Sequence, residues 1–175
     1  MQITVKGIGG IVARVKAYQN RLEDKTHKFL EELAKIGIDT AEIKFKSAIY
    51  DGVNDVFVDK SPRWEGENTL YIVAEGNAVA FIEFGTGVHY TEQHPKAAEL
   101  GIQRGTFGQG KGSREAWGYY GTQGSNPTPE SRVIERGGQT VVITKGNPPA
   151  RAMYEAGKAM REKVVEIAKE VFAND

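Results

Sequence analysis

Apolar residues recur every three or four positions through the first part of the chain. The series is Ile8, Ile11, Val15, Tyr18, Leu22, Phe29, Leu33 and Ile36, with one longer step after Leu22. This spacing places the residues on one face of a helix, and charged residues fill the other face. Gly37 interrupts the pattern without ending it. The pattern therefore predicts one long helix over residues 8–50, closed by Asp51-Gly52.

The period changes after residue 55, where β-branched and aromatic residues gather in two runs. Residues 56–58 and 69–73 are separated by Pro62 and by Gly66-Glu67-Asn68, which predicts two strands in a hairpin or meander. Residues 78–84 follow and stop at Gly85. Glycine commonly ends a helix, so we expect a short helix there.

A third strand and a second long helix are predicted near the C-terminus. Residues 139–144 are rich in β-branched side chains. Asn147 or Pro148 lies near the expected N-cap, with Pro149 in the first turn. A helical stripe then runs to Phe172 through Met153, Ala156, Met160, Val164, Ile167 and Val171. We expect a single α+β domain over residues 1–175, with a small antiparallel sheet packed by the N-terminal and C-terminal helices.

The segment between these elements has neither period. Twelve of the 21 glycines lie within residues 85–138. A long irregular run inside a compact domain is typical of a functional loop or of disorder. Phe107, Trp117, Tyr119 and Tyr120 are unlike the aromatic-poor composition of disordered chains. We therefore expect residues 88–138 to form an inserted Gly-rich arm that orders against a partner.

Composition removes several classes of chemistry. The chain has no cysteine, which excludes a cysteine-ligated zinc site, an iron–sulfur cluster, a thiol nucleophile and a disulfide framework. Its 23 basic and 23 acidic residues balance, which disfavours nucleic-acid binding by the monomer. The longest apolar run, residues 78–82, is far shorter than the ~20 residues of a membrane span. The N-terminus lacks a signal-peptide core, so we expect a cytoplasmic protein with no membrane partner.

One motif suggests nucleotide binding. Gly105–Lys111 matches the first seven positions of a phosphate-binding loop. Gly112 stands where that motif needs Ser or Thr to place a hydroxyl on magnesium. In addition, no apolar strand precedes the run and no helical pattern follows it. These departures favour a flexible loop, and a nucleotide-binding enzyme remains an alternative.

The histidines do not form a recognisable catalytic or metal-binding set. His89 and His94 flank Glu92, but no third ligand is marked, and zinc needs three or four ligands in fixed geometry. His27 falls on the polar face of the first helix, and the chain has no Gly-x-Ser-x-Gly elbow. We therefore expect no catalytic residue, no metal ligand and no cofactor.

The arm carries six basic and five acidic residues, which make a mixed surface in a monomer. In a ring, each basic residue repeats once per subunit. If Arg104, Lys111 and Arg114 faced a central hole, they would form a collar able to contact DNA phosphates without reading sequence. A free-standing nucleic-acid-binding module is the second alternative, and the near-zero net charge argues against it.

Two segments resemble a known family of long-tailed bacteriophages. Residues 81–87, Phe-Ile-Glu-Phe-Gly-Thr-Gly, resemble the Glu-Phe-Gly-Thr-Gly signature of the tail-completion, or head–tail joining, family of minor tail components. Residues 148–151, Pro-Pro-Ala-Arg, resemble that family's Pro-Ala-Arg-Pro-Phe opening of the last helix, although Ala152-Met153 replaces its final Pro-Phe. The predicted order of helices and strands is also similar.

The resemblance implies a structural protein of the virion neck, not an enzyme. It implies a ring of six copies between the head connector, or stopper, and the tail tube protein, with DNA passing through the lumen. Such a ring would be assembled in the host cytoplasm. Ring closure needs two different, matching surfaces on each subunit. The residues expected at subunit or neighbour interfaces are Phe81, Glu83, Phe84, Gly85, Thr86, Gly87, Phe107, Trp117, Tyr119, Tyr120 and Arg151.

Arg151 falls in the predicted first turn of the last helix, where the helix dipole disfavours a cation. We therefore expect an anionic partner, with Glu83 as the candidate. The alternative is that Arg151 extends into solvent, because exposed ion pairs contribute only ~0–1 kcal/mol.

Overall fold

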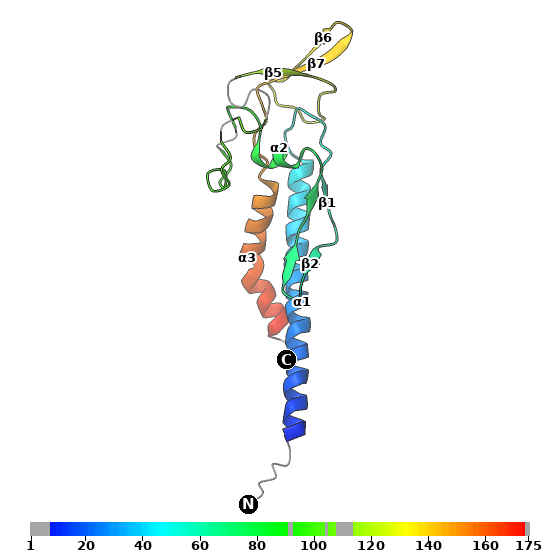
Figure 1. Ribbon diagram of the computed structural model, residues 1–175, viewed down its shortest axis with the longest axis vertical. Coiled ribbons are helices and arrows are strands. Elements are labelled where there is room, and N and C mark those ends of the chain that lie inside the picture. The colour runs from blue at the N-terminus through cyan, green and yellow to red at the C-terminus, as the bar shows by residue number, and fades with distance from the viewer. Residues whose placement is uncertain (1–7, 91–92, 104, 108–113, 174–175) are drawn as a thin grey trace, which may run out of the picture.

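The protein is an elongated α+β molecule, with its two long helices at one end and a small sheet at the other (Figure 1). This computed structural model describes residues 8–90, 93–103, 105–107 and 114–173. The elements are α1 (Ile8–Lys46), β1 (Phe57–Val58), β2 (Arg63–Glu65), β3 (Thr69–Tyr71), β4 (Ala74–Glu75), α2 (Val79–Phe84), β5 (Trp117–Tyr120), β6 (Arg132–Arg136), β7 (Gln139–Thr144) and α3 (Ala152–Phe172). The predicted fold class is therefore confirmed.

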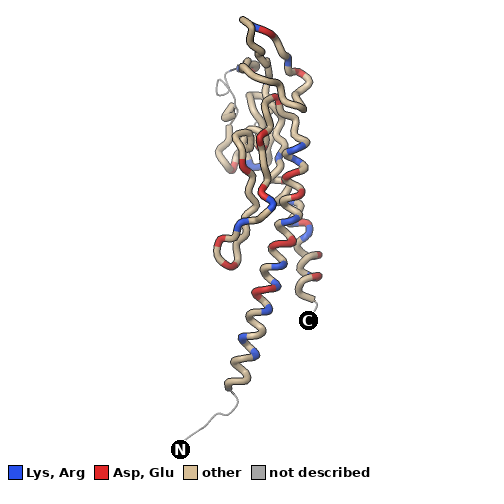
Figure 2. Tube along the Cα trace, turned by 90° about the vertical axis from the view of Figure 1, so that its right-hand side faces the viewer, with Lys and Arg blue, Asp and Glu red and all other residues tan. Residues whose placement is uncertain are grey.

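Helix α1 forms the long axis of the molecule, and α3 packs along its second half (Figure 1). Gly37 permits this approach, because a Cβ atom there would lie 2.3 Å from Ile72 Cδ1 and 2.8 Å from Met160 Sδ. The main core lies where α1, α2 and α3 meet, around the buried residues Phe45, Ile82 and Ala156. Helix α1 also continues past the end of α3. Along this protruding part, basic residues (blue in Figure 2) come before the first acidic residue, Glu23.

The predicted end of the first helix is wrong by four residues, because α1 stops at Lys46. Side-chain amides donate to backbone carbonyls at the end of α1 and just beyond it. Asn54 Nδ2 donates to Phe45 O at 2.8 Å, and Asn126 Nδ2 donates to Ala48 O at 3.1 Å. Such side-chain donors satisfy carbonyl groups that have no partner within the helix.

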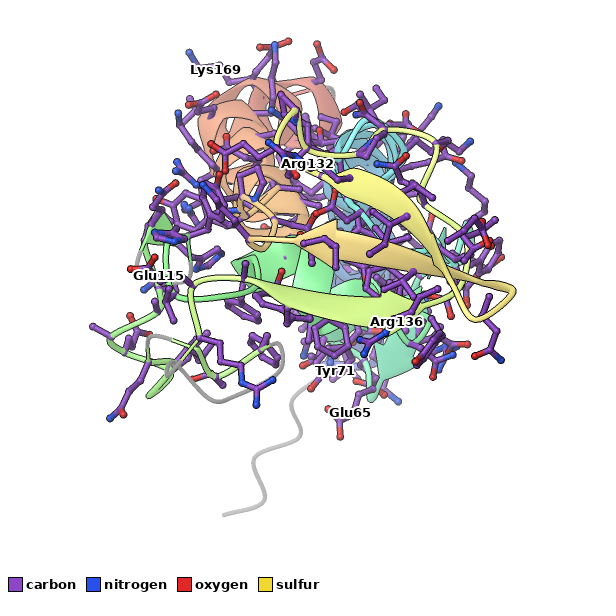
Figure 3. The ribbon with its side chains drawn as sticks, turned by 90° about the horizontal axis from the view of Figure 1, so that it is seen from above. Glu65, Tyr71, Glu115, Arg132, Arg136 and Lys169 are labelled. Carbon is purple, nitrogen blue, oxygen red and sulfur yellow. The ribbon has the colours of Figure 1, made fainter. Side chains whose placement is uncertain are left out.

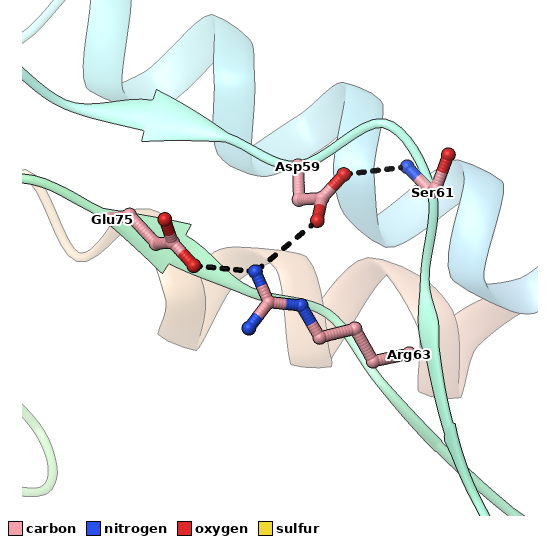
Figure 4. Close-up of polar contacts among 4 residues, drawn as sticks. All are labelled: Asp59, Ser61, Arg63 and Glu75. Atoms are coloured by element: carbon pink, nitrogen blue, oxygen red, sulfur yellow. Dashed lines mark hydrogen bonds and ion pairs between the residues drawn. The ribbon is translucent and has the colours of Figure 1, made fainter.

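Residues 57–75 form one long hairpin lying against α1. Strand β1 pairs with β4, and β2 pairs with β3 around Gly66. The expected hairpin is present, but Thr69–Tyr71 pairs with Arg63–Glu65, which the sequence pattern left as a connection. Arg63 links the two arms of the hairpin through Glu75 and Asp59, and Asp59 also accepts a 3.0 Å hydrogen bond from Ser61 N–H (Figure 4).

The upper sheet is antiparallel and has the order β5-β7-β6. Strand β7 covers the predicted residues 139–144, whereas β5 and β6 lie within the segment that was expected to lack strands. That expectation is wrong for a physical reason. Every residue of β6 is exposed, so burial imposes no alternation of apolar and polar positions, and Gly118 interrupts β5.

Helix α2 agrees with the prediction and ends at Phe84, with Gly85 as its C-cap. The start of α3 does not agree, because Arg151 is the N-cap and the first helical residue is Ala152. The preceding backbone is held by α2, since Ala150 N–H donates to Ile82 O at 2.8 Å and Arg151 N–H donates to Glu83 O at 3.2 Å. No helix in the described part of the chain is long and apolar enough to cross a membrane.

Candidate functional site

The residues of the Glu-Phe-Gly-Thr-Gly run meet the start of α3, and Glu83 is the centre of this junction. Its side chain is buried. The carboxylate accepts hydrogen bonds from Met153 N–H at 2.8 Å and Tyr154 N–H at 3.0 Å. These N–H groups lie in the first turn of α3 and have no partner within the helix, so an anion placed there caps the helix and complements its dipole. Glu83 therefore joins α2 to α3.

His94 completes the surroundings of Glu83 from the loop that follows α2. Lys96 N–H donates to His94 Nδ1 at 3.1 Å, which requires the proton of a neutral ring to be on Nε2. Nε2–H then donates to Glu83 Oε1 at 3.2 Å. Both ring nitrogens are engaged in holding the loop, so neither is free to act as a general base.

The predicted ion pair between Glu83 and Arg151 is wrong. The Glu83 carboxylate is occupied by α3 and His94, and Arg151 Nε is buried without a hydrogen-bond partner. Arg151 contacts Glu83 through the backbone instead. Its φ of 56° is the one positive value among the described non-glycine residues. L-residues adopt this left-handed conformation at a cost of about 1 kcal/mol or more.

The Gly85-Thr86-Gly87 segment runs beside Asn147. Gly85 has φ 78°, and a Cβ atom there would lie 2.7 Å from Asn147 O. Thr86 N–H donates to Asn147 O at 2.9 Å. Thr86 Oγ1 accepts from both the backbone N–H and the side-chain amide of Asn147, each at 2.9 Å. A residue larger than glycine at position 85 would force these two backbones apart.

Asp51 carries a second buried polar network, next to the first. Its carboxylate accepts from Thr128 N–H at 2.8 Å, from Thr128 Oγ1 at 3.1 Å and from Thr144 Oγ1. Asp51 N–H donates to Asn147 Oδ1 at 2.7 Å. A buried carboxylate is stable only with such partners. Asp51 therefore joins the end of α1 to the upper sheet.

Tyr119 of β5 closes this network from the sheet side, since its hydroxyl donates to Asp51 O. Burial, together with the charge of Asp51 and the proximity of Tyr50, raises the pKa of Tyr119 to about 12. A cavity of about 180 Å³ lies between these groups and is also lined by Phe81 and Trp117. Its lining is mainly aromatic and hydrogen-bonded side chains, as expected of a structural joint.

Most aromatic residues predicted to contact neighbouring subunits pack within their own chain. The ring of Phe107 stacks on Phe84 at a centroid distance of 5.9 Å and meets Phe81 edge-on at 5.6 Å. Trp117 lies against Gly87. Tyr120 differs from these, because 66% of its surface is exposed.

The other candidate sites receive little support from the described residues. Arg104, Lys111 and most of the Gly105–Lys111 loop lie outside the described residues, as does Glu92, and Arg114 is exposed. No group of three or more potential metal ligands occurs in the described ranges. A cavity of about 730 Å³ adjoins residues 93–103, but the one titratable side chain among its described lining residues is His94. His27 lies against Trp64 and bonds to Glu67 O at 2.9 Å.

Sequence reasoning missed Asp51, Thr128 and Thr144 as members of one site. Asp51 was interpreted as a helix stop, and both threonines lie far from it along the chain. An isolated acidic residue at the end of a long apolar stripe was the one available signal. Comparisons of the whole chain gave no match to any protein-family model, to any curated protein or to any solved structure.

Proposed function

We propose that this chain is a structural, non-enzymatic tail-completion protein of a tailed-phage neck. In this role six copies form a ring between the head connector and the tail tube, and DNA passes through the lumen. The Glu-Phe-Gly-Thr-Gly resemblance supports the family. The junction supports a structural role, because Thr86 and Asn147 bind each other and Glu83 binds the backbone of α3.

The observation that carries the proposal is the protruding part of α1. Ile11, Val15, Tyr18 and Leu22 form one stripe and are 64%, 60%, 56% and 45% exposed. Isolated helices shorter than ~12–15 residues are marginal in water. The protruding part of α1 exposes an apolar stripe and packs on no core residue of the described chain. It therefore gains stability when a partner covers that stripe.

The charges of the same segment indicate which kind of partner covers it. Residues 8–22 contain Arg14, Lys16 and Arg21 and no acidic residue. Two such helices packed side by side would repel each other. A different, neutral or acidic surface of the next subunit fits better, and contacts between two different surfaces can close into a ring.

Light scattering of the purified full chain, together with negative-stain electron microscopy, tests the proposal. We expect concentration-dependent assembly into six-membered rings. Tyr18→Glu places a charge in the apolar stripe and should abolish assembly. Asn20→Glu adds the same charge on the opposite face of the same helix and should leave assembly intact.

Two outcomes would overturn the proposed function. One is a wild-type chain that stays monomeric at every accessible concentration. The other is saturable magnesium–nucleotide binding with turnover, which would favour the alternative of a nucleotide-binding enzyme.

A further inference from the structure

The upper sheet has two open edges. In the described part of the chain, β5 and β6 each pair with β7 and with no other strand. An outer strand presents a row of unpaired N–H and C=O groups, and proteins commonly protect such edges with charges or proline. Strand β5 contains neither, and the centre of β6 is Val133-Ile134, which is 47% and 44% exposed.

One exposed apolar residue from each edge belongs to the same row across the sheet. Tyr120 of β5 and Ile134 of β6 are both register partners of Val141 in β7. Residues directly opposite one another share a face of a sheet. The next row is Tyr119, Val142 and Val133. Its first two members face the rest of the molecule, since Val142 is fully buried and Tyr119 reaches Asp51, whereas Val133 at the sheet edge is 47% exposed. Tyr120 and Ile134 therefore lie on the opposite, outer face of the sheet, on either side of Val141, which is only 7% exposed between them.

The strand directions determine how a second copy can continue the sheet. Strands β5 and β6 both run antiparallel to β7, so they are parallel to each other. Consider a neighbouring copy whose sheet turns its outer face to the same side as that of the first copy. Its strand β5 can lie beside strand β6 of the first copy, with the two strands parallel. A twofold dimer would instead pair β6 with β6 in antiparallel. Figure 3 looks down onto the sheet, with Arg132 and Arg136 labelled on β6.

We propose that β6 of one copy pairs in parallel with β5 of the next, which extends the upper sheet from subunit to subunit. Ile134 then lies beside Tyr120 of the neighbouring copy and continues the outer apolar row. The uncharged strand β5 offers no repulsion to Arg132 and Arg136. This contact joins two different surfaces and can close into a ring. The inference rests on the proposed function and names one of its subunit interfaces.

Cysteine cross-linking tests this pairing, because the chain contains no cysteine of its own. The double variant Tyr120→Cys/Ile134→Cys carries one thiol at each edge. The two thiols of one chain lie two strand spacings apart, about 9.5 Å, which is too far for an internal disulfide. Oxidation of the assembled protein should therefore give a ladder of covalent multimers on a non-reducing gel.

The matched control is Tyr120→Cys/Val133→Cys. It moves one thiol by a single residue, to the other face of β6, and should give a ladder at least tenfold weaker. The single variant Ile134→Cys should remain monomeric on the gel.

Covalent dimers of the single variant Ile134→Cys would overturn the proposal in favour of a twofold β6–β6 contact. An assembled protein, by light scattering, whose double variant gives no ladder would overturn the edge pairing and leave the proposed function standing. A chain that never assembles would contradict the proposed function itself, and the pairing with it.

Discussion

At the scale of single residues, Glu83 and Arg151 show how the start of α3 is determined. The carboxylate caps two backbone N–H groups, and Arg151 enters the helix in a left-handed conformation. Charge alone predicted that the two side chains would attract each other. The N–H groups of α3 are better partners for Glu83, because they are fixed in place and have no alternative acceptor in the helix.

Replacing Arg151 separates the cost of this backbone conformation from the contribution of the side chain. Arg151→Gly and Arg151→Ala both remove the side chain, but only glycine adopts a positive φ without strain. We expect the glycine variant to be more stable than the alanine variant by about 1 kcal/mol, measured by urea unfolding. Equal stabilities would contradict a strained N-cap.

Tyr119 predicts a specific dependence of stability on pH. Its pKa in the folded protein is about 12, above the ordinary value of 10.0. The neutral phenol therefore stabilises the fold below pH 10, and this contribution is lost as the pH rises through 12. Tyr119→Phe should lose less stability than the wild type between those pH values, as measured by urea midpoints. Tyr120→Phe, at the exposed neighbouring position, should behave like the wild type.

At the scale of elements, the helices were predictable, whereas the strands β2, β5 and β6 were not. The apolar stripe of α1 leaves a clear period in the sequence, although only its second half is buried within the described chain. Helix α2 is marked by the glycine that caps its C-terminus. The exposed strand β6 leaves no period. The start of α3 was placed too early because Pro149 suits a first turn, whereas the carbonyls of Ile82 and Glu83 hold residues 150–151 outside the helix.

Gly37 controls the distance between α1 and its neighbours, and Gly37→Leu tests this. Its side chain would collide with Ile72 and Met160, so we expect a loss of roughly 1–3 kcal/mol in the free energy of unfolding. Gly10→Leu is the matched control, because a Cβ atom at Gly10 meets nothing within 4 Å. That variant should not be less stable than the wild type, since leucine favours helix more than glycine does.

At the scale of the whole molecule, the protruding part of α1 contributes little to the stability of the part of the molecule that contains the core clusters. The two core clusters begin at Phe29, and no described core residue precedes it. A chain that lacks residues 1–22 should therefore unfold at a midpoint within a few degrees of the full chain, measured by circular dichroism. A fall of more than about 10 °C, which corresponds to roughly 2.5–5 kcal/mol, would show that the protruding part of α1 supports the rest of the molecule.

The buried network of Asp51 has a consequence for how the chain folds during synthesis. Its partners Thr128, Thr144 and Asn147 lie 77, 93 and 96 residues further along. Closing such distant contacts is slow compared with forming a helix. On the ribosome, α1 emerges and coils long before these partners exist. Asp51 therefore stays exposed to water until residue 147 has been synthesised, and translation that stops before Asn147 releases a product open to proteases at this end.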